Sequence, residues 1–105
     1  IKVTLNDATG RELKMLEDNQ ALKERLAGFA LGKKEFFSFP TVDGTQLNGY
    51  IIKPADFDPN KKYPVLMYVY GGPGSQNVLN SWGGTRDFWH QQLAAEGIIV
   101  ACVDN

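Results

Sequence analysis

The segment VLMYVYGGPGS, residues 65–75, decides how the chain is expected to fold. Its first part, residues 65–70, is apolar or aromatic without alternation, which is typical of a strand buried on both faces. A loop rich in glycine follows at residues 71–75. A buried strand that leads into such a loop predicts the start of an α/β unit.

The residues after this loop complete a strand–helix–strand pattern. We expect a helix over residues 85–96, capped by Thr85, with Trp89 and Leu93 four residues apart on its inner stripe. A second apolar strand follows at residues 98–103. Two strands joined by a helix in this way pair in parallel, so the pattern predicts a βαβ unit. Because this strand comes last, we expect it to be an open sheet edge.

Upstream of the segment, the sequence predicts an antiparallel hairpin. Residues 36–39 and 47–52 form two apolar runs, and Asp43-Gly44 between them is a strong turn signal. The fold class expected for this half is therefore α/β, with an antiparallel hairpin leading into the βαβ unit.

The first part of the chain has a different character. Residues 1–5 and 13–16 read as two short strands around a turn at 6–10, and Asp18 and Asn19 are good starters for a short helix. The composition changes near residues 30–35, where we expect the boundary between the two halves.

Composition excludes several classes of partner. The 105 residues carry a net charge of −1 with no basic run, which argues against binding to nucleic acid or to an anionic membrane. No apolar stretch approaches the roughly 20 residues that span a bilayer. The single cysteine, Cys102, lies in an apolar run and is expected to be a small buried hydrophobe.

The sequence contains no nucleophile motif for acyl transfer. The α/β-hydrolase serine sits in G-x-S-x-G, whereas Ser75 has Pro73 two residues before it and Asn77 two residues after it. The only histidine, His90, has no acidic residue four positions away, and we expect it at the surface or boundary of its helix. One histidine and one cysteine also exclude the usual zinc spacings, so no metal is expected.

The glycine-rich loop and Tyr70 leave two interpretations open. In α/β-hydrolases the loop after the third strand supplies donors to the oxyanion hole, and a phenol at Tyr70 can donate there. The other interpretation, equally supported by the spacing, is that the loop is only a tight turn with no functional role. Taken alone, Tyr70 reads better as a boundary tyrosine with a packed ring.

Several motifs together resemble the dipeptidyl-peptidase IV branch of the prolyl oligopeptidase family of serine peptidases. The motifs are KKYPVL at 61–66, VYGGPGSQ at 69–76, LEDN at 16–19 followed by Ala21-Leu22, and VDN at 103–105. They occur in the family's order and cover essentially the whole chain, which is more specific than the glycine-rich loop alone.

The resemblance implies the last strands of a β-propeller at residues 1–17 and the N-terminal part of an α/β-hydrolase domain at 18–105, cut before the nucleophile elbow. The full enzyme releases Xaa-Pro and Xaa-Ala dipeptides from peptide N-termini without metal or cofactor, and Tyr70 matches its oxyanion-hole tyrosine. The resemblance places the Ser-Asp-His triad outside the chain, which is expected to be inactive alone. Bacterial enzymes of this type are exported, which favours the periplasm.

Two alternatives stay open at this point. One is another hydrolase, related to proline iminopeptidases or acylaminoacyl-peptidases, which also carry a glycine-proline loop after the third strand. The other is a non-catalytic α/β module that self-associates through its open edge strand. Burial of apolar side chains at such an edge is worth roughly 1.5–3 kcal/mol each, so we expect a homodimer or larger assembly in either case.

Overall fold

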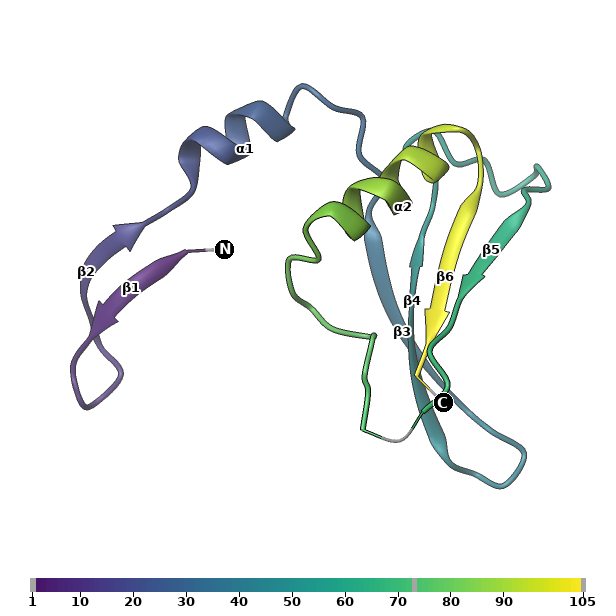
Figure 1. Cartoon of the computed structure of the whole chain (residues 1–105), viewed down its shortest axis with the longest axis horizontal. Coiled ribbons are helices and arrows are strands. Elements are labelled where there is room, and N and C mark those ends of the chain that lie inside the picture. Colours follow the sequence, from purple (N-terminus) through teal and green to yellow (C-terminus); the bar gives the residue numbers. More distant parts are fainter. Residues whose placement is uncertain (1, 73, 105) are drawn as a thin grey trace.

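The computed structural model describes residues 2–72 and 74–104, which form two sheets and two helices. Figure 1 shows that a two-stranded hairpin lies apart from a four-stranded sheet, with helix α1 between them. Strands β1 (Val3–Asn6) and β2 (Glu12–Glu17) pair in antiparallel fashion to form the hairpin. Strands β3 (Lys34–Pro40), β4 (Gln46–Ile52), β5 (Val65–Tyr68) and β6 (Ile99–Val103) form the larger sheet.

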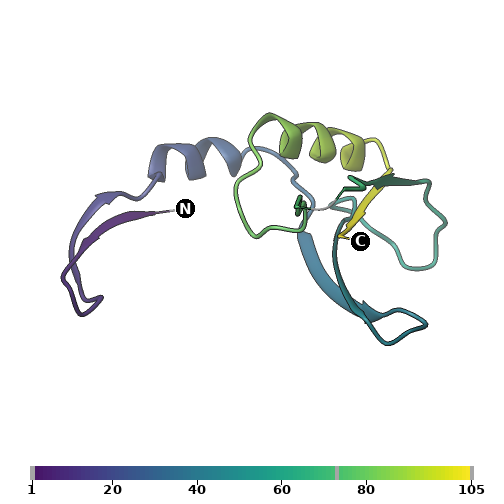
Figure 2. The same cartoon turned by 60° about the horizontal axis from the view of Figure 1, so that its bottom comes forward.

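The β1–β2 hairpin is held by its turn and its backbone ladder. Asp7 accepts the backbone N–H groups of Thr9 and Arg11, and Gly10 adopts a positive φ of 86°. Every residue of β2 is exposed, and neither strand packs on another described helix or strand. The hairpin therefore lies at a distance from the larger sheet in both views of Figures 1 and 2, and an isolated ribbon of this kind has little stability of its own.

The larger sheet is mixed, with the strand order β3-β4-β6-β5. β3 and β4 form the predicted antiparallel hairpin, and Gly44 takes the positive φ of 87° that its turn requires. β5 and β6 are parallel and are joined through helix α2 (Thr85–Ala95), which confirms the βαβ unit. β6 also pairs with β4, so it lies in the middle of the sheet.

The expected open edge at residues 98–103 is therefore wrong. β6 is covered on both sides, and the edge strands are β5 and β3. Chain order did not reveal this, because the last strand inserts between the hairpin and β5 instead of adding to the outside. It is the most buried strand of the sheet, with Val100 and Cys102 fully buried.

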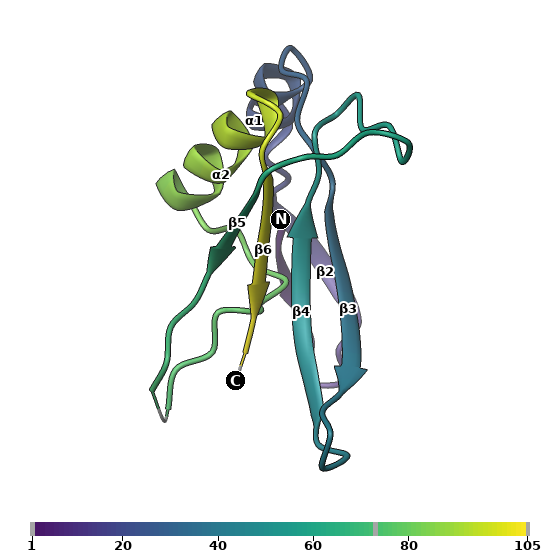
Figure 3. The same ribbon diagram turned by 90° about the vertical axis from the view of Figure 1, so that its right-hand side faces the viewer.

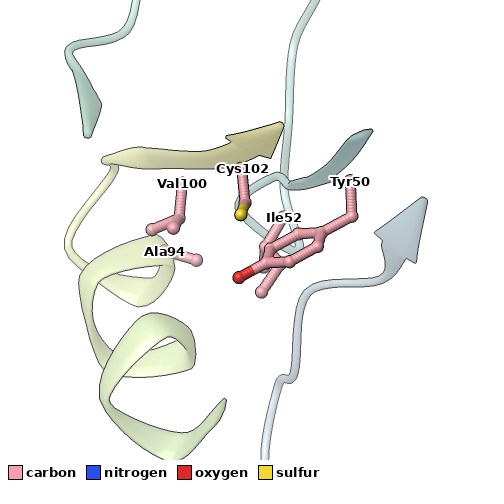
Figure 4. Close-up of a cluster of buried hydrophobic side chains, with 5 residues drawn as sticks. All are labelled: Tyr50, Ile52, Ala94, Val100 and Cys102. Carbon is pink, nitrogen blue, oxygen red and sulfur yellow. The ribbon is translucent and has the colours of Figure 1, made fainter. Parts of the chain in front are cut away.

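The core lies between α2 and one face of the sheet. Figure 4 shows its five buried side chains, which come from β4, β6 and α2: Tyr50, Ile52, Ala94, Val100 and Cys102. Leu66, Tyr68, Val78 and Leu93 pack around them. Cys102 is fully buried, as predicted, and burial raises the pKa of its thiol.

The opposite face of the sheet is not covered by any described helix. Side chains alternate along β5, so Leu66 and Tyr68 face the core while Val65 and Met67 remain 58% and 53% exposed. The expectation of a strand buried on both faces is therefore wrong for β5. An apolar sequence without alternation is typical of a strand that is packed on both faces, but the described residues pack against only one face of β5.

The start of α2 differs from the prediction, whereas α1 begins where it was expected. Thr85 is the first residue of α2 and makes no capping hydrogen bond, because Gly84 takes the cap position at a φ of 60°. Helix α1 (Gln20–Leu26) begins after Asn19 in the left-handed region, and the Asp18 carboxylate accepts the N–H of Gln20. Neither helix has the length and apolar character needed to cross a membrane in the part of the chain described here.

Candidate functional site

The glycine-rich loop and the end of β6 meet at one edge of the sheet. β5 and β6 run in parallel with Tyr68 opposite Cys102, so the chain leaving each strand emerges on the same side. Figure 3 shows the C-terminal end of β6 beside the segment that follows β5. The carboxyl ends of parallel strands are where α/β proteins usually bind ligands. This edge carries Tyr70 and Asp104.

Tyr70 lies two residues beyond the end of β5 and is 56% exposed. Gly72 follows it so closely that a Cβ at that position would lie 3.3 Å from Cε1 of the Tyr70 ring. Gly74 adopts a φ of 87°, which side chains other than glycine rarely tolerate. A side chain at position 72 would therefore crowd the Tyr70 ring, and one at position 74 would strain the backbone.

Asp104 fastens the far end of this loop to the sheet. Its Oδ1 accepts the backbone N–H of Asn77 at 2.7 Å, and its Oδ2 accepts the N–H of Val78 at 3.0 Å. The backbone N–H of Asp104 donates to the carbonyl of Asn48 at the same edge, at 3.0 Å. A carboxylate that accepts two backbone N–H groups forms short, charge-assisted hydrogen bonds.

A polar cavity of about 550 Å³ opens between the loop and the β3–β4 hairpin. The residues that line it come from β4, from the loop and from the end of β6: Gln46, Leu47, Asn48, Gly72, Gly74, Ser75, Gln76 and Asp104. The cavity is therefore built by the same elements that hold the Tyr70 loop.

A second polar cluster lies at the start of α2, away from the loop. Lys34 makes an ion pair with both carboxylate oxygens of Asp87, at 3.1 and 3.2 Å, and Asp87 also accepts the N–H of Gly83. Arg86 donates to the hydroxyl of Tyr68 at 3.2 Å. These contacts join β3, β5 and α2 and explain why polar residues are tolerated beside the core.

His90 is buried more deeply than the sequence predicted. It is fully buried rather than at the surface or boundary, and neither ring nitrogen has a hydrogen-bond partner among the described residues. Its ring lies 5.4 Å from that of Tyr68 and 5.3 Å from that of Trp89. Desolvation lowers the pKa of His90, so the neutral imidazole is favoured.

Trp89 was expected on the inner stripe of α2 but is 49% exposed, because the inner stripe passes through His90 and Ala94.

Tyr70, the one residue expected to carry chemistry, lies at the loop edge of the sheet. His90 and Ser75, for which no catalytic role was expected, lie under α2 and in the lining of the cavity. Residues 2–72 and 74–104 contain no group of three His, Cys, Asp or Glu side chains arranged to hold a metal ion.

A role for Asp104 was not predicted from the sequence, although a signal was present. An acidic residue directly after a strand that is parallel to the strand of the loop is expected at the same sheet edge.

No protein-family model matches the chain, but curated proteins have similar sequences. It is 43% identical over 103 residues to prolyl endopeptidase FAP of Bos taurus, across 96% of this chain and 13% of that protein. It is 42% identical over 71 residues to dipeptidyl peptidase 8 of Mus musculus, across 68% of this chain and 8% of that protein.

The fold is also similar to that of a peptidase of known structure. The crystal structure of Porphyromonas gingivalis dipeptidyl peptidase 4 matches 98% of this chain with a TM-score of 0.84 and 44% sequence identity, and this match covers 14% of that chain. The mixed sheets with few helices are therefore similar to part of that peptidase. The chain belongs to the dipeptidyl-peptidase IV branch of the prolyl oligopeptidase family of serine peptidases. It spans about an eighth of the bovine relative's length.

Proposed function

We propose that the chain is part of a serine-type dipeptidyl peptidase that releases Xaa-Pro and Xaa-Ala dipeptides from peptide N-termini. The relatives named as dipeptidyl peptidases support this activity. The peptide substrate is bound and cleaved by the longer protein, which needs no metal or cofactor for an acyl-enzyme mechanism.

We assign residues 18–105 to the beginning of the α/β-hydrolase domain and residues 1–17 to the last strands of a β-propeller. Two observations support this division. The β1–β2 hairpin packs on no other described helix or strand, which fits a piece of a separate domain. The sheet order β3-β4-β6-β5, with its last two strands parallel, fits the start of a larger α/β sheet.

The role proposed for Tyr70 is to donate its phenolic O–H to the oxyanion of the tetrahedral intermediate. The observation that carries this role is its location: an accessible phenol at the carboxyl edge of a parallel pair, on a loop that borders a polar cavity. No serine of the chain lies in the elbow pattern, so the serine, aspartate and histidine come from other parts of the peptidase. The chain alone is accordingly inactive.

The test uses the longer peptidase and a panel of chromogenic Gly-Pro, free Pro and acetyl-Ala substrates. We expect the parent enzyme to cleave the Gly-Pro substrate. We expect Y70F, which lacks the oxyanion donor, to lower kcat by about 10²- to 10³-fold. Tyr63 provides a matched control, since its hydroxyl accepts the N–H of Asp58 in another loop, and Y63F should retain the parent kcat. Preference for free Pro or acetyl-Ala would instead indicate an iminopeptidase or an acylaminoacyl-peptidase.

A second candidate function, self-association, has its own support. β5 is an edge strand, and its outward side chains Val65 and Met67 lie on the sheet face that no described helix covers. An exposed apolar edge of this kind pairs readily with another strand. We propose that the chain studied by itself forms a homodimer or larger assembly through β5.

A further inference from the structure

We propose that Asp104 is a positioning residue for the reaction, because it fixes the loop that carries Tyr70. This inference rests on the proposed function and assigns a role to a residue with no function in the sequence analysis. Asp104 does not touch the reacting atoms in this account. It acts on them through the loop.

The contacts of Asp104 leave it little freedom. Both carboxylate oxygens accept backbone N–H groups of the loop, from Asn77 and Val78, and its own N–H is bound to Asn48 on β4. Asp104 also comes directly after Val103, the last residue of β6. Asp104 therefore links the loop to two strands of the sheet at once.

The loop has few other supports. Residues 71–72 and 74–78 contain no helix or strand, and glycine at positions 72 and 74 gives the backbone more conformational freedom than other residues would. At one end the loop is continuous with β5. At the other end Val78 packs against the core, beside the two hydrogen bonds to Asp104. In this proposal, the position of Tyr70 at the β5 end of the loop depends on the hydrogen bonds to Asp104 at its other end.

A small displacement is sufficient for a large kinetic effect. Misplacing a catalytic group by about 1 Å can cost roughly 10²-fold in rate. Removal of the Asp104 carboxylate frees the N–H groups of Asn77 and Val78 and lets the loop move by such an amount. The loss is expected in kcat, because an oxyanion donor acts in the transition state more than in substrate binding.

The experiment is a double-mutant cycle in the longer peptidase with its Gly-Pro substrate. We expect D104A to lower kcat by roughly 10- to 100-fold and to change KM by less than about threefold. In the Y70F background the same substitution should cost less than about threefold, because its effect passes through the missing hydroxyl. D104N, which retains one acceptor oxygen, should recover part of the lost kcat and remains informative if D104A does not fold.

The matched control is D58A. Asp58 also accepts a backbone N–H, that of Asn60 at 2.9 Å, but in the loop before β5 at the opposite end of the sheet. We expect D58A to retain the parent kcat. Equal losses from D104A with and without Tyr70, or a D104A enzyme with the parent kcat, would overturn the inference alone. An inactive parent enzyme would overturn the proposed function, and this inference with it.

Discussion

Replacement of His90 by leucine is expected to stabilise the fold and to remove part of its sensitivity to acid. His90 is fully buried with two ring nitrogens that have no hydrogen-bond partner among the described residues. An unpaired buried polar group costs about 1–3 kcal/mol. Leucine removes this penalty and fills a similar volume between Tyr68 and Trp89. We expect H90L to raise the free energy of unfolding by about 1–3 kcal/mol near neutral pH.

The pH dependence follows from the direction of the pKa shift. Burial lowers the pKa of His90 below its ordinary value of 6.5, so the unfolded chain takes up the proton first as the pH falls. The contribution to stability is full above the unfolded pKa and is lost as the pH falls toward the folded pKa, by at most about 1.4 kcal/mol per pH unit. Of the charged groups nearby, Asp87 favours protonation, whereas Arg86 and Lys34 oppose it.

The assay is urea unfolding of the chain, followed by tryptophan fluorescence, at several values between about pH 7.5 and about pH 5.5. This window avoids Asp7, Glu35 and Asp43, whose hydrogen bonds lower their pKa values and whose effects appear in more acidic solution. The parent chain should lose stability across the window, and H90L should lose less. A leucine variant less stable than the parent at neutral pH, or one with the same pH slope, would refute the reasoning.

Two further perturbations test the packing and the edge of the sheet. Gln91 exchanges two hydrogen bonds with the backbone of Gly32, at 2.7 and 2.8 Å, so Q91A should lower the free energy of unfolding by about 1–3 kcal/mol. The neighbouring variant Q92A, which removes only an exposed contact with Glu96, should change it by less than about 0.5 kcal/mol, and equal effects would contradict the assignment. A lysine at Met67 on edge strand β5 should shift the chain toward the monomer in light scattering, and an unchanged molar mass would exclude assembly through this strand.

Local sequence patterns predicted the elements of the fold well. The turn at Asp43-Gly44 and the βαβ unit around the glycine-rich loop are both present, because hairpin turns and apolar strands depend on neighbouring residues. Strand order was not predicted, since the insertion of β6 between β4 and β5 is a non-local pairing without a local signal. The exposure of one face of β5 was not predicted, because an apolar sequence without alternation is typical of a strand packed on both faces. The described residues pack against only one face of β5.

The candidate site was predicted only in part. The location of Tyr70 where the strand meets the loop was predicted to within two residues, since β5 ends at Tyr68, whereas its role came from the family resemblance and stays a proposal. The burial of His90 was not predicted because histidine suits both a helix surface and a core boundary, and the difference depends on the rotation of α2 over the sheet. The contact of Asp104 with the loop required the register of β5 against β6.

The central location of β6 has a consequence for synthesis on the ribosome. β4 and β5 do not pair with each other, so neither can complete the sheet until the strand that separates them has been translated. At roughly 5–20 residues per second, the apolar faces of β4 and β5 stay open for seconds while α2 and β6 are made. During that interval the exposed apolar surface of the nascent hairpin can be bound by a chaperone. Substitutions in β6 should therefore reduce the yield of folded protein more than they slow the finished enzyme.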